Sequence, residues 1–338
     1  MLLESALKER GEPVYRARQI WEWTTRGAGG YAEMTNVPAR LRAELRELVP
    51  FSTLRVVEEA HAKDGTVKTL FTTHDRHAVE AVLMRYRDGR RSVCVSSQSG
   101  CPLTCRFCAT GSMAFGRNLT CWEILDQVLH FRRTGVLDHC VFMGMGEPML
   151  NVDEVLTACR RLTDIGITPR RTAVSTVGWI PGMRRFAEEL DEPVKLALSL
   201  HAPDDELRAQ LMPVNERYPL HDVLAACAAY HNRRRRKVFV EYVMLAGVND
   251  EPAHASALAA LLDRAIYKVN LIPYNPTGDF EGSTRERIAE FKSVLDAARL
   301  PATVRLTRGR EIDAACGQLA VLRRLPSPRP EPDSRRSP

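Results

Sequence analysis

The spacing of apolar positions divides the chain into two parts. Up to about residue 70, apolar residues recur at helical intervals, as in 19–23 and 37–48, and a glycine-rich break at 27–30 separates these two stretches. Residues 1–70 are therefore expected to form a small helical N-terminal domain.

Beyond that point, short runs rich in apolar and β-branched residues replace the helical spacing, as is typical of strands. Three runs come first, VKTLFT, AVEAVLM and SVCVS, and the pair Asp88 and Gly89 predicts a turn before the third. Strand-like and helix-like stretches then alternate, which indicates a parallel sheet with crossover helices. The predicted helices are 122–133, 152–165, 183–190, 220–231, 254–265 and 284–298, and the predicted strands are HCVFMG, RTAVST, VKLALSL, VFVEYVML, VNLIPY and ATVRLT.

About six such strand–helix units fit an α/β fold, a partial (β/α)6 barrel of TIM type, which we expect over residues 71–320 together with flanking strands. Residues 321–338, rich in Pro, Ser and Arg, are expected to be disordered. Four polar motifs, GMGEP, STVG, SLH and IPYNP, each follow a predicted strand. Because active sites of parallel β/α barrels are built at the carboxyl ends of the strands, these motifs are expected to meet at one rim.

Composition narrows the class of protein. The net charge is +6 and Arg dominates the basic residues, which favours a polyanionic partner. An odd number of cysteines, nine, argues against a secreted disulfide framework. The N-terminus carries Glu4, Lys8 and Glu9 and has no long apolar stretch, and no apolar run approaches the ~20 residues of a membrane helix. We expect a cytoplasmic protein that does not enter a membrane.

Three cysteines in the run SGCPLTCRFCATG carry the most specific chemistry. Cys101, Cys105 and Cys108 are spaced C-x3-C-x2-C, and three thiolates so close can hold a 4Fe–4S cluster with one iron left open. The alternative is a structural zinc site, which usually recruits a fourth ligand nearby, yet no histidine lies between Gly100 and Cys121. The spacing is the signature of the radical S-adenosylmethionine (SAM) enzymes, and the chain resembles that superfamily.

The chain, apart from its tail, further resembles the RlmN family of radical SAM adenine-C2 RNA methyltransferases. The matching stretches keep the family's order along the chain. They are ARQIWEW, DGTVKTLF, VEAVLM, CVSSQSGCPLTCRFCATG, RNLT, FMGMGEPMLN, STVG, SLHAP, LMPVNERYPL, GVND, NLIPYNP and EIDAACGQL.

This resemblance implies one 4Fe–4S cluster and two SAM molecules per turnover, and it assigns roles to individual residues. Cys316 matches the cysteine that becomes methylated, Cys94 its resolving partner, and Glu80 the proton acceptor. Judged without the resemblance, Cys94 and Cys316 are more often inert buried thiols. The implied cluster ligands are Cys101, Cys105 and Cys108, and the implied SAM site comprises Gly146, Glu147, Ser175, Ser199, Leu200, His201 and Asn275.

The chemistry of adenine explains why such parts are needed. The C2 carbon lies between two ring nitrogens and is too electron-poor to attack the methyl group of SAM. In the implied mechanism Cys316 takes a methyl group from SAM, and a 5′-deoxyadenosyl radical from a second SAM activates that methyl group for addition to C2. A base then removes the C2 proton, and Cys94 attacks the sulfur of Cys316 to form a disulfide.

The resemblance also implies partners, namely an adenine of 23S rRNA, adenine 37 of tRNAs, and an electron donor such as flavodoxin or ferredoxin. We expect a monomer. The basic run 233–237, together with Arg16, Arg18 and Arg26 of the N-terminal segment, is a candidate phosphate-contacting surface. The target adenine must be unstacked to reach the site.

Three other functions stay open at this point. A Cfr-type enzyme, which methylates C8 of the same adenine, shares the cluster and both cysteines. The RlmN-like sequences of MPVNERYPL and DAACGQL favour methylation at C2. A non-catalytic RNA-binding protein with a structural metal site belongs to another class. A radical SAM enzyme acting on a small molecule is disfavoured by the Arg-rich N-terminal segment.

Overall fold

The computed structural model describes residues 2–320. The tail expected to be disordered, 321–338, lies outside the described residues. Among those residues, the helices are too short or too polar for any of them to cross a bilayer.

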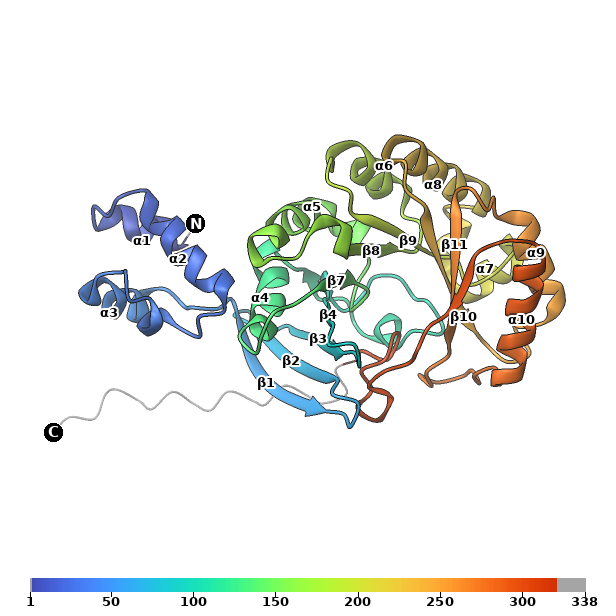
Figure 1. Ribbon diagram of the computed structural model, residues 1–338, viewed down its shortest axis with the longest axis horizontal. Coiled ribbons are helices and arrows are strands. Elements are labelled where there is room, and N and C mark those ends of the chain that lie inside the picture. Colours follow the sequence, from blue (N-terminus) through green and yellow to red (C-terminus); the bar gives the residue numbers. More distant parts are fainter. Residues whose placement is uncertain (1, 321–338) are drawn as a thin grey trace.

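Three N-terminal helices form a small body beside the main domain, at the left of Figure 1. They bury their own apolar cluster, in which Met34 and Leu45 are inaccessible to solvent. Gly27 ends the second helix with a φ of 103°, a left-handed conformation that suits glycine. The helices are α1 (Leu2–Glu9), α2 (Tyr15–Arg26) and α3 (Ala39–Leu48).

The helical segment is shorter than its predicted extent to residue 70. Residues 54–61 form a strand, β1 (Leu54–His61), which pairs antiparallel with β2 (Val67–Thr73). Most side chains of β1 are exposed or half-buried because β1 is an edge strand. Such a strand lacks the alternation of a half-buried sheet, so hydrogen bonding to β2 fixes its structure more than its apolar pattern does.

The main domain contains a ten-stranded sheet in the order β1-β2-β3-β4-β7-β8-β9-β10-β11-β12. Strands β1 to β4 pair antiparallel, and β4 pairs parallel with β7, as does every later neighbour through β12. Because β1 and β12 are both edges, the barrel is open, which confirms the predicted partial (β/α)6 architecture. The remaining strands are β3 (Ala78–Arg85), β4 (Arg91–Cys94), β7 (His139–Phe142), β8 (Thr172–Thr176), β9 (Lys195–Ser199), β10 (Val238–Met244), β11 (Tyr267–Pro273) and β12 (Ala302–Val304), while β5 (Gln98–Ser99) and β6 (Arg117–Asn118) pair separately.

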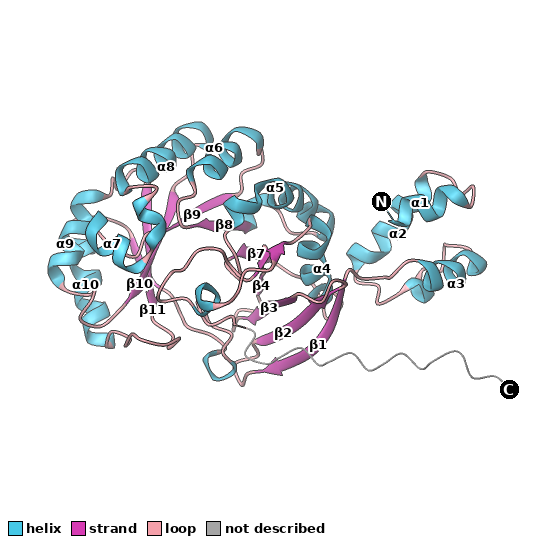
Figure 2. Cartoon of the chain, turned by 180° about the vertical axis from the view of Figure 1, so that it is seen from behind, coloured by secondary structure: helices cyan, strands magenta, loops and turns pink. Residues whose placement is uncertain are grey.

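Helices cover the outer face of the parallel strands, as Figures 1 and 2 show from opposite sides. The strand side chains that face them, such as Leu196, Val240 and Leu271, are fully buried in the main core. The short α7 was not predicted, and α6 begins at Ile180, where Pro181 suits the first helical turn. The helices are α4 (Cys121–Arg132), α5 (Val152–Arg161), α6 (Ile180–Glu189), α7 (Asp205–Leu211), α8 (Leu220–Arg234), α9 (Pro252–Leu261) and α10 (Arg285–Ala297).

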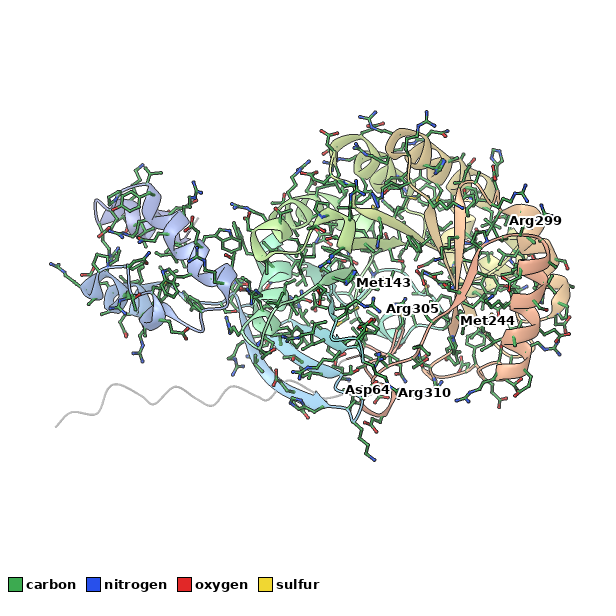
Figure 3. All side chains as sticks on the ribbon, in the orientation of Figure 1. Asp64, Met143, Met244, Arg299, Arg305 and Arg310 are labelled. Carbon is green, nitrogen blue, oxygen red and sulfur yellow. The ribbon has the colours of Figure 1, made fainter. Side chains whose placement is uncertain are left out.

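The segment after β12, residues 305–320, crosses the open side of the barrel, and we call it the strap. Gly309 N donates to the Asp64 carboxylate at 3.2 Å and Lys68 Nζ donates to Asp313 O at 3.2 Å, so the strap is tied to the β1–β2 turn and to β2. Figure 3 shows its Arg310 beside Asp64, with Arg305 nearer the centre of the barrel. The strap thereby carries its cysteine to the mouth of the barrel.

Candidate active site

One cavity lies at the carboxyl ends of the parallel strands, where the four polar motifs were expected to meet. The cysteine loop 101–108 and the strap complete its wall. Of the residues assigned to the site from the sequence, Leu200, Cys94 and Glu80 do not line it. The assigned residues that do line it are Cys101, Cys105, Cys108, Gly146, Glu147, Ser175, Ser199, His201, Asn275 and Cys316.

The three cysteines of the loop are free thiols, and their spacing distinguishes between metal centres. Among the described residues, the group that brings three ligand atoms within 4.8 Å of one another is His74, Asp75 and Glu123, so the three sulfurs are spread more widely. Sulfurs that share one tetrahedral zinc ion lie about 3.8 Å apart, as the Zn–S distance requires. Ligands of a 4Fe–4S cluster bind different irons. The loop therefore fits a cluster better than a single zinc ion.

The group of His74, Asp75 and Glu123 is itself a poor metal site. Arg117 contacts both carboxylates, at 2.6 Å from Asp75 and 2.7 Å from Glu123. A cation would have to displace this guanidinium.

Replacing Cys105 by alanine is expected to remove the cluster, because the described residues offer no spare thiol or imidazole in the loop. Iron and sulfide analysis after anaerobic reconstitution measures this directly. Cys227→Ala, which changes a buried thiol on α8, is the control and should retain iron. Wild-type iron content in Cys105→Ala would show that the loop is not the cluster site.

Glu147 presents a buried carboxylate to the cavity. Its oxygens accept hydrogen bonds from Val177 N at 2.9 Å and Met149 N at 3.0 Å, and burial raises its pKa to about 7. The preceding Gly146 has a φ of 95°, and a Cβ there would lie 2.5 Å from Cβ of Gln98, so glycine is required. A cationic amine in the cavity would favour the ionised form of Glu147. This carboxylate thus fits the α-ammonium group of SAM.

Small polar groups and one histidine line the next strand ends. Ser175 Oγ and Ser199 Oγ lie 3.2 Å apart. Leu200 packs into the main core, and its backbone N donates to Glu241 O at 3.1 Å, so its side chain does not reach the cavity. His201 Nδ1 accepts a hydrogen bond from Val243 N at 3.0 Å, and burial lowers its pKa to about 3. The ring is therefore neutral and carries its proton on Nε2, as a donor.

Several buried polar residues of the site were missed by sequence reasoning. Arg208 donates to Val177 O at 2.5 Å and to Leu200 O at 3.2 Å, so it joins the loops that follow β8 and β9. Glu241, inside the barrel, contacts Arg305 Nη1 at 3.4 Å. No local pattern marks these residues, because their partners come from other strands.

The strap holds Cys316 against the cysteine loop. Asn275 Nδ2 donates to Cys316 O at 3.3 Å, and Ala109 N, next to a cluster cysteine, donates to Gly317 O at 2.8 Å. Cys316 is exposed to the cavity, and Arg305 offsets part of the rise that desolvation causes in the pKa of its thiol. Cys316 therefore lies in the cavity beside a guanidinium that favours its thiolate.

Cys94 and Glu80 lie outside the lining of this cavity, on the paired strands β4 and β3, and Cys94 packs with Leu319 of the strap. Burial, together with the nearby Cys316, raises the pKa of Cys94 to about 12. Glu80 lies 3.4 Å from Lys68 Nζ, yet its Oε2 is buried without a hydrogen-bond partner among the described residues. Burial raises the pKa of Glu80 to about 7. A half-satisfied carboxylate with that pKa can accept a proton near neutral pH.

The basic residues proposed for RNA contact are more scattered than expected. Arg16 is buried and pairs with Glu12 at 3.0 Å, so it is not a surface cation. Arg18 and Arg26 are exposed on α2. The run 233–237 precedes β10 and therefore lies at the end of the barrel opposite the cavity.

Comparisons with known proteins agree with this site. The family model of the radical SAM superfamily matches residues 95–259. The dual-specificity RNA methyltransferase RlmN of Syntrophobacter fumaroxidans is 42% identical over 329 residues, 94% of this chain and 95% of that protein. A probable RlmN of Symbiobacterium thermophilum is 45% identical, covering 93% and 87% of the two chains.

A solved radical SAM methyltransferase from Sphaerobacter thermophilus has the same fold. Its TM-score is 0.88 at 45% identity, and the match covers 94% of this chain and 96% of that one. Membership of this superfamily implies a 4Fe–4S cluster and SAM, which the three loop cysteines and Glu147 fit. The chain belongs to the RlmN family of radical SAM RNA methyltransferases.

Proposed function

We propose that the protein methylates C2 of an adenine in 23S rRNA, and adenine 37 of tRNAs, with a methyl group first carried by Cys316. One observation carries the proposal. Cys316 lies in the same cavity as the three cluster cysteines and Glu147, and it is near enough to Cys94 to raise the pKa of that thiol. Reduced flavodoxin or ferredoxin is the proposed source of electrons, and the protein is proposed to act as a monomer in the cytoplasm.

A methyl carrier is needed because C2 of adenine is too electron-poor to attack the methyl group of SAM directly. Cys316, with Arg305 favouring its thiolate, is suited to accept that methyl group by displacement. When bound, the cluster and SAM supply the methyl group and the 5′-deoxyadenosyl radical that activates it, hence two SAM per turnover. Glu147, Ser175, Ser199, His201 and Asn275 hold the cofactor, with the backbone of Gly146 and Leu200 beside them.

Completion of the reaction depends on two residues just outside the cavity lining, Glu80 and Cys94. Glu80 accepts the C2 proton, for which its free oxygen and its raised pKa suit it. The odd electron of the radical adduct would pass to the bound cluster. Cys94 then attacks Sγ of Cys316, so that an S–S bond forms and the S–C bond breaks with its electron pair going to the methylene carbon, which takes a proton and leaves as the methyl group of the base.

Nucleoside analysis of cellular RNA tests the proposal. In cells that lack the protein, 2-methyladenosine should disappear from digested 23S rRNA and from tRNA, and a plasmid copy should restore it. Restoration of 8-methyladenosine instead would identify a Cfr-type enzyme. If neither nucleoside changes, RNA methylation is not its activity.

The pH dependence of the final steps is expected to follow Glu80. Only the ionised carboxylate accepts a proton, so the rate of C2 proton loss should rise about tenfold per pH unit below pH 7 and level off above it. Single-turnover loss of deuterium from RNA deuterated at C2, with enzyme already methylated at Cys316, measures this rate. Glu80→Gln should be slow at every pH, whereas Glu80→Asp should retain a pH-dependent rate. An unchanged profile in Glu80→Gln would assign the proton to another base.

A further inference from the structure

At the end of the barrel away from the cavity, the inner face of the sheet carries polar and partly exposed side chains, whereas its outer face is buried under helices. Side chains alternate between the two faces, and residues of β10 such as Glu241 and Val243 face the cavity side. Two residues before Glu241, Phe239 therefore faces inward, and it is half-exposed. Lys195 on β9 and Lys268 on β11 are half-exposed inward as well. Barrels of this kind usually fill such positions with apolar layers, so the polar, accessible floor needs an explanation.

Cations from several elements converge on this floor. Lys195 and Lys268 each place Nζ 5.9 Å from the centre of the Phe239 ring. We call the basic group at the amino ends of β7 to β11 the basic floor. It consists of the cations Arg171, Lys195, Arg236 and Lys268, together with His139, which is neutral because burial and the neighbouring Lys195 and Arg171 lower its pKa.

The charges of the basic floor are poorly compensated. Arg171 pairs with Asp138 at 3.4 Å, but within residues 2–320 no carboxylate lies within 4.0 Å of Lys195, Arg236 or Lys268. Burial lowers the pKa of Lys195, and the neighbouring Arg236 and Lys268 lower it further. Like charges that repel one another in this way are stabilised by a bound anion.

The cations of the basic floor are not explained by the stabilisation of helix C-termini. Arg233 and Arg234, at the end of α8, donate to backbone carbonyls near the end of α6, which is a common role for such residues. Lys195 and Lys268 lie on strands, where no helix dipole requires a cation.

We propose that the basic floor binds phosphodiester groups of the RNA whose adenine enters the cavity, with Phe239 holding Lys195 and Lys268 beside one another. A positively charged surface that follows the phosphodiester backbone is typical of single-stranded nucleic acid sites. The inference rests on the proposed function, because it extends the contact with the same RNA to the far end of the barrel.

The geometry favours RNA over an acidic electron-donor protein at this surface. Phe239 lies ~7 Å along β10 from Glu241, which lines the cavity, and ~17 Å from Met244 at the end of the strand, and Figure 3 shows Arg299 at the floor end with Met244 and Arg305 toward the mouth. A flexible RNA strand can span this length. A donor docked on the floor would have the barrel between it and the cysteine loop, and electron transfer slows steeply with distance.

Salt-dependent RNA binding tests the proposal. The probe is a fluorescein-labelled single-stranded RNA with a central adenine, followed by anisotropy at increasing KCl concentration. The double variant Lys195→Gln/Lys268→Gln should bind more weakly, and the slope of log affinity against log salt should flatten by ~1.4, since each phosphate contact contributes ~0.7. Lys195→Arg/Lys268→Arg should keep the wild-type slope.

The matched control removes the same charge elsewhere. Arg287→Gln/Lys292→Gln changes two cations of α10 that pair with Glu290 and Asp296, and its slope should equal that of wild type. Iron content and methylation of Cys316 by SAM alone, which need no RNA, should be normal in the Gln variant.

An unchanged slope in the Gln variant overturns the proposal. Normal RNA binding with loss of reduction by flavodoxin would also overturn it, and would assign the floor to a redox partner. If the slope of log affinity against log salt is flatter in the Gln variant than in wild type, but the wild type forms no methyladenosine, then the proposed function is wrong and the RNA-binding surface is still supported.

Discussion

Cys316→Ala is expected to abolish RNA methylation while leaving the cluster and SAM binding intact. The cavity wall supplies the cluster cysteines and Glu147 from other loops, so loss of the Cys316 thiol leaves in place the residues that fit the cluster and SAM. Loss of a covalent nucleophile typically costs ~10⁴-fold or more in turnover. Methyl transfer from isotopically labelled SAM to RNA measures the loss, and iron analysis with SAM binding in the same preparation shows that the site is otherwise formed.

Peptide mass spectrometry supplies the positive half of this prediction. After incubation with SAM, the wild-type peptide containing Cys316 should be heavier by one methylene unit, and Cys159→Ala, which changes a buried thiol on α5, should behave as wild type. A Cys316 peptide that is never methylated, or methyltransferase activity in Cys316→Ala, would contradict the carrier role.

The order of elements in the barrel was predictable because each parallel strand is buried on its helical side. The resulting apolar runs, such as VKLALSL and VFVEYVML, are separated by helical stretches. Strand β1 was not predictable in the same way, because it lies at an edge and exposes most of its side chains. The apolar pattern of a sequence reflects which side chains are buried, and an edge strand such as β1 buries few of its side chains.

The mouth of the cavity was predictable for a topological reason. Parallel strands bring the residues after each of them to one rim, so GMGEP, STVG, SLH and IPYNP had to meet there. Arg208 and Arg305 were not predictable, since each contacts residues distant in the sequence. The strap also depends on tertiary contacts, with Asp64 and with Ala109, that no local pattern contains.

The basic run 233–237 illustrates the limit of composition. Its charge indicated a polyanionic partner, but its position at the amino end of β10 was needed to show that it lies opposite the cavity. Lys195 and Lys268, single cations within apolar strands, carried no signal in the sequence, although the fold places both beside Phe239.

Cys94→Ala is expected to leave RNA covalently attached to the protein. In the proposed sequence of steps the carbon on Cys316 bonds to the adenine before Cys94 acts, so loss of Cys94 blocks release without blocking addition. Its location agrees with this order, because Cys94 lies outside the cavity that holds Cys316 and yet responds to the charge of that thiol. Cys140→Ala, which changes a buried thiol on the adjacent strand β7, should release RNA normally.

The RNA that stays attached to Cys94→Ala tests the proposed roles of Cys94 and Cys316 in one experiment. Protein purified under denaturing conditions and digested with ribonuclease should retain a nucleotide on the Cys316 peptide in Cys94→Ala. The double variant Cys94→Ala/Cys316→Ala should retain none, since the carbon that forms the bond is absent. Nucleotide retained in the double variant would place the attachment elsewhere, and normal turnover by Cys94→Ala would remove Cys94 from the reaction.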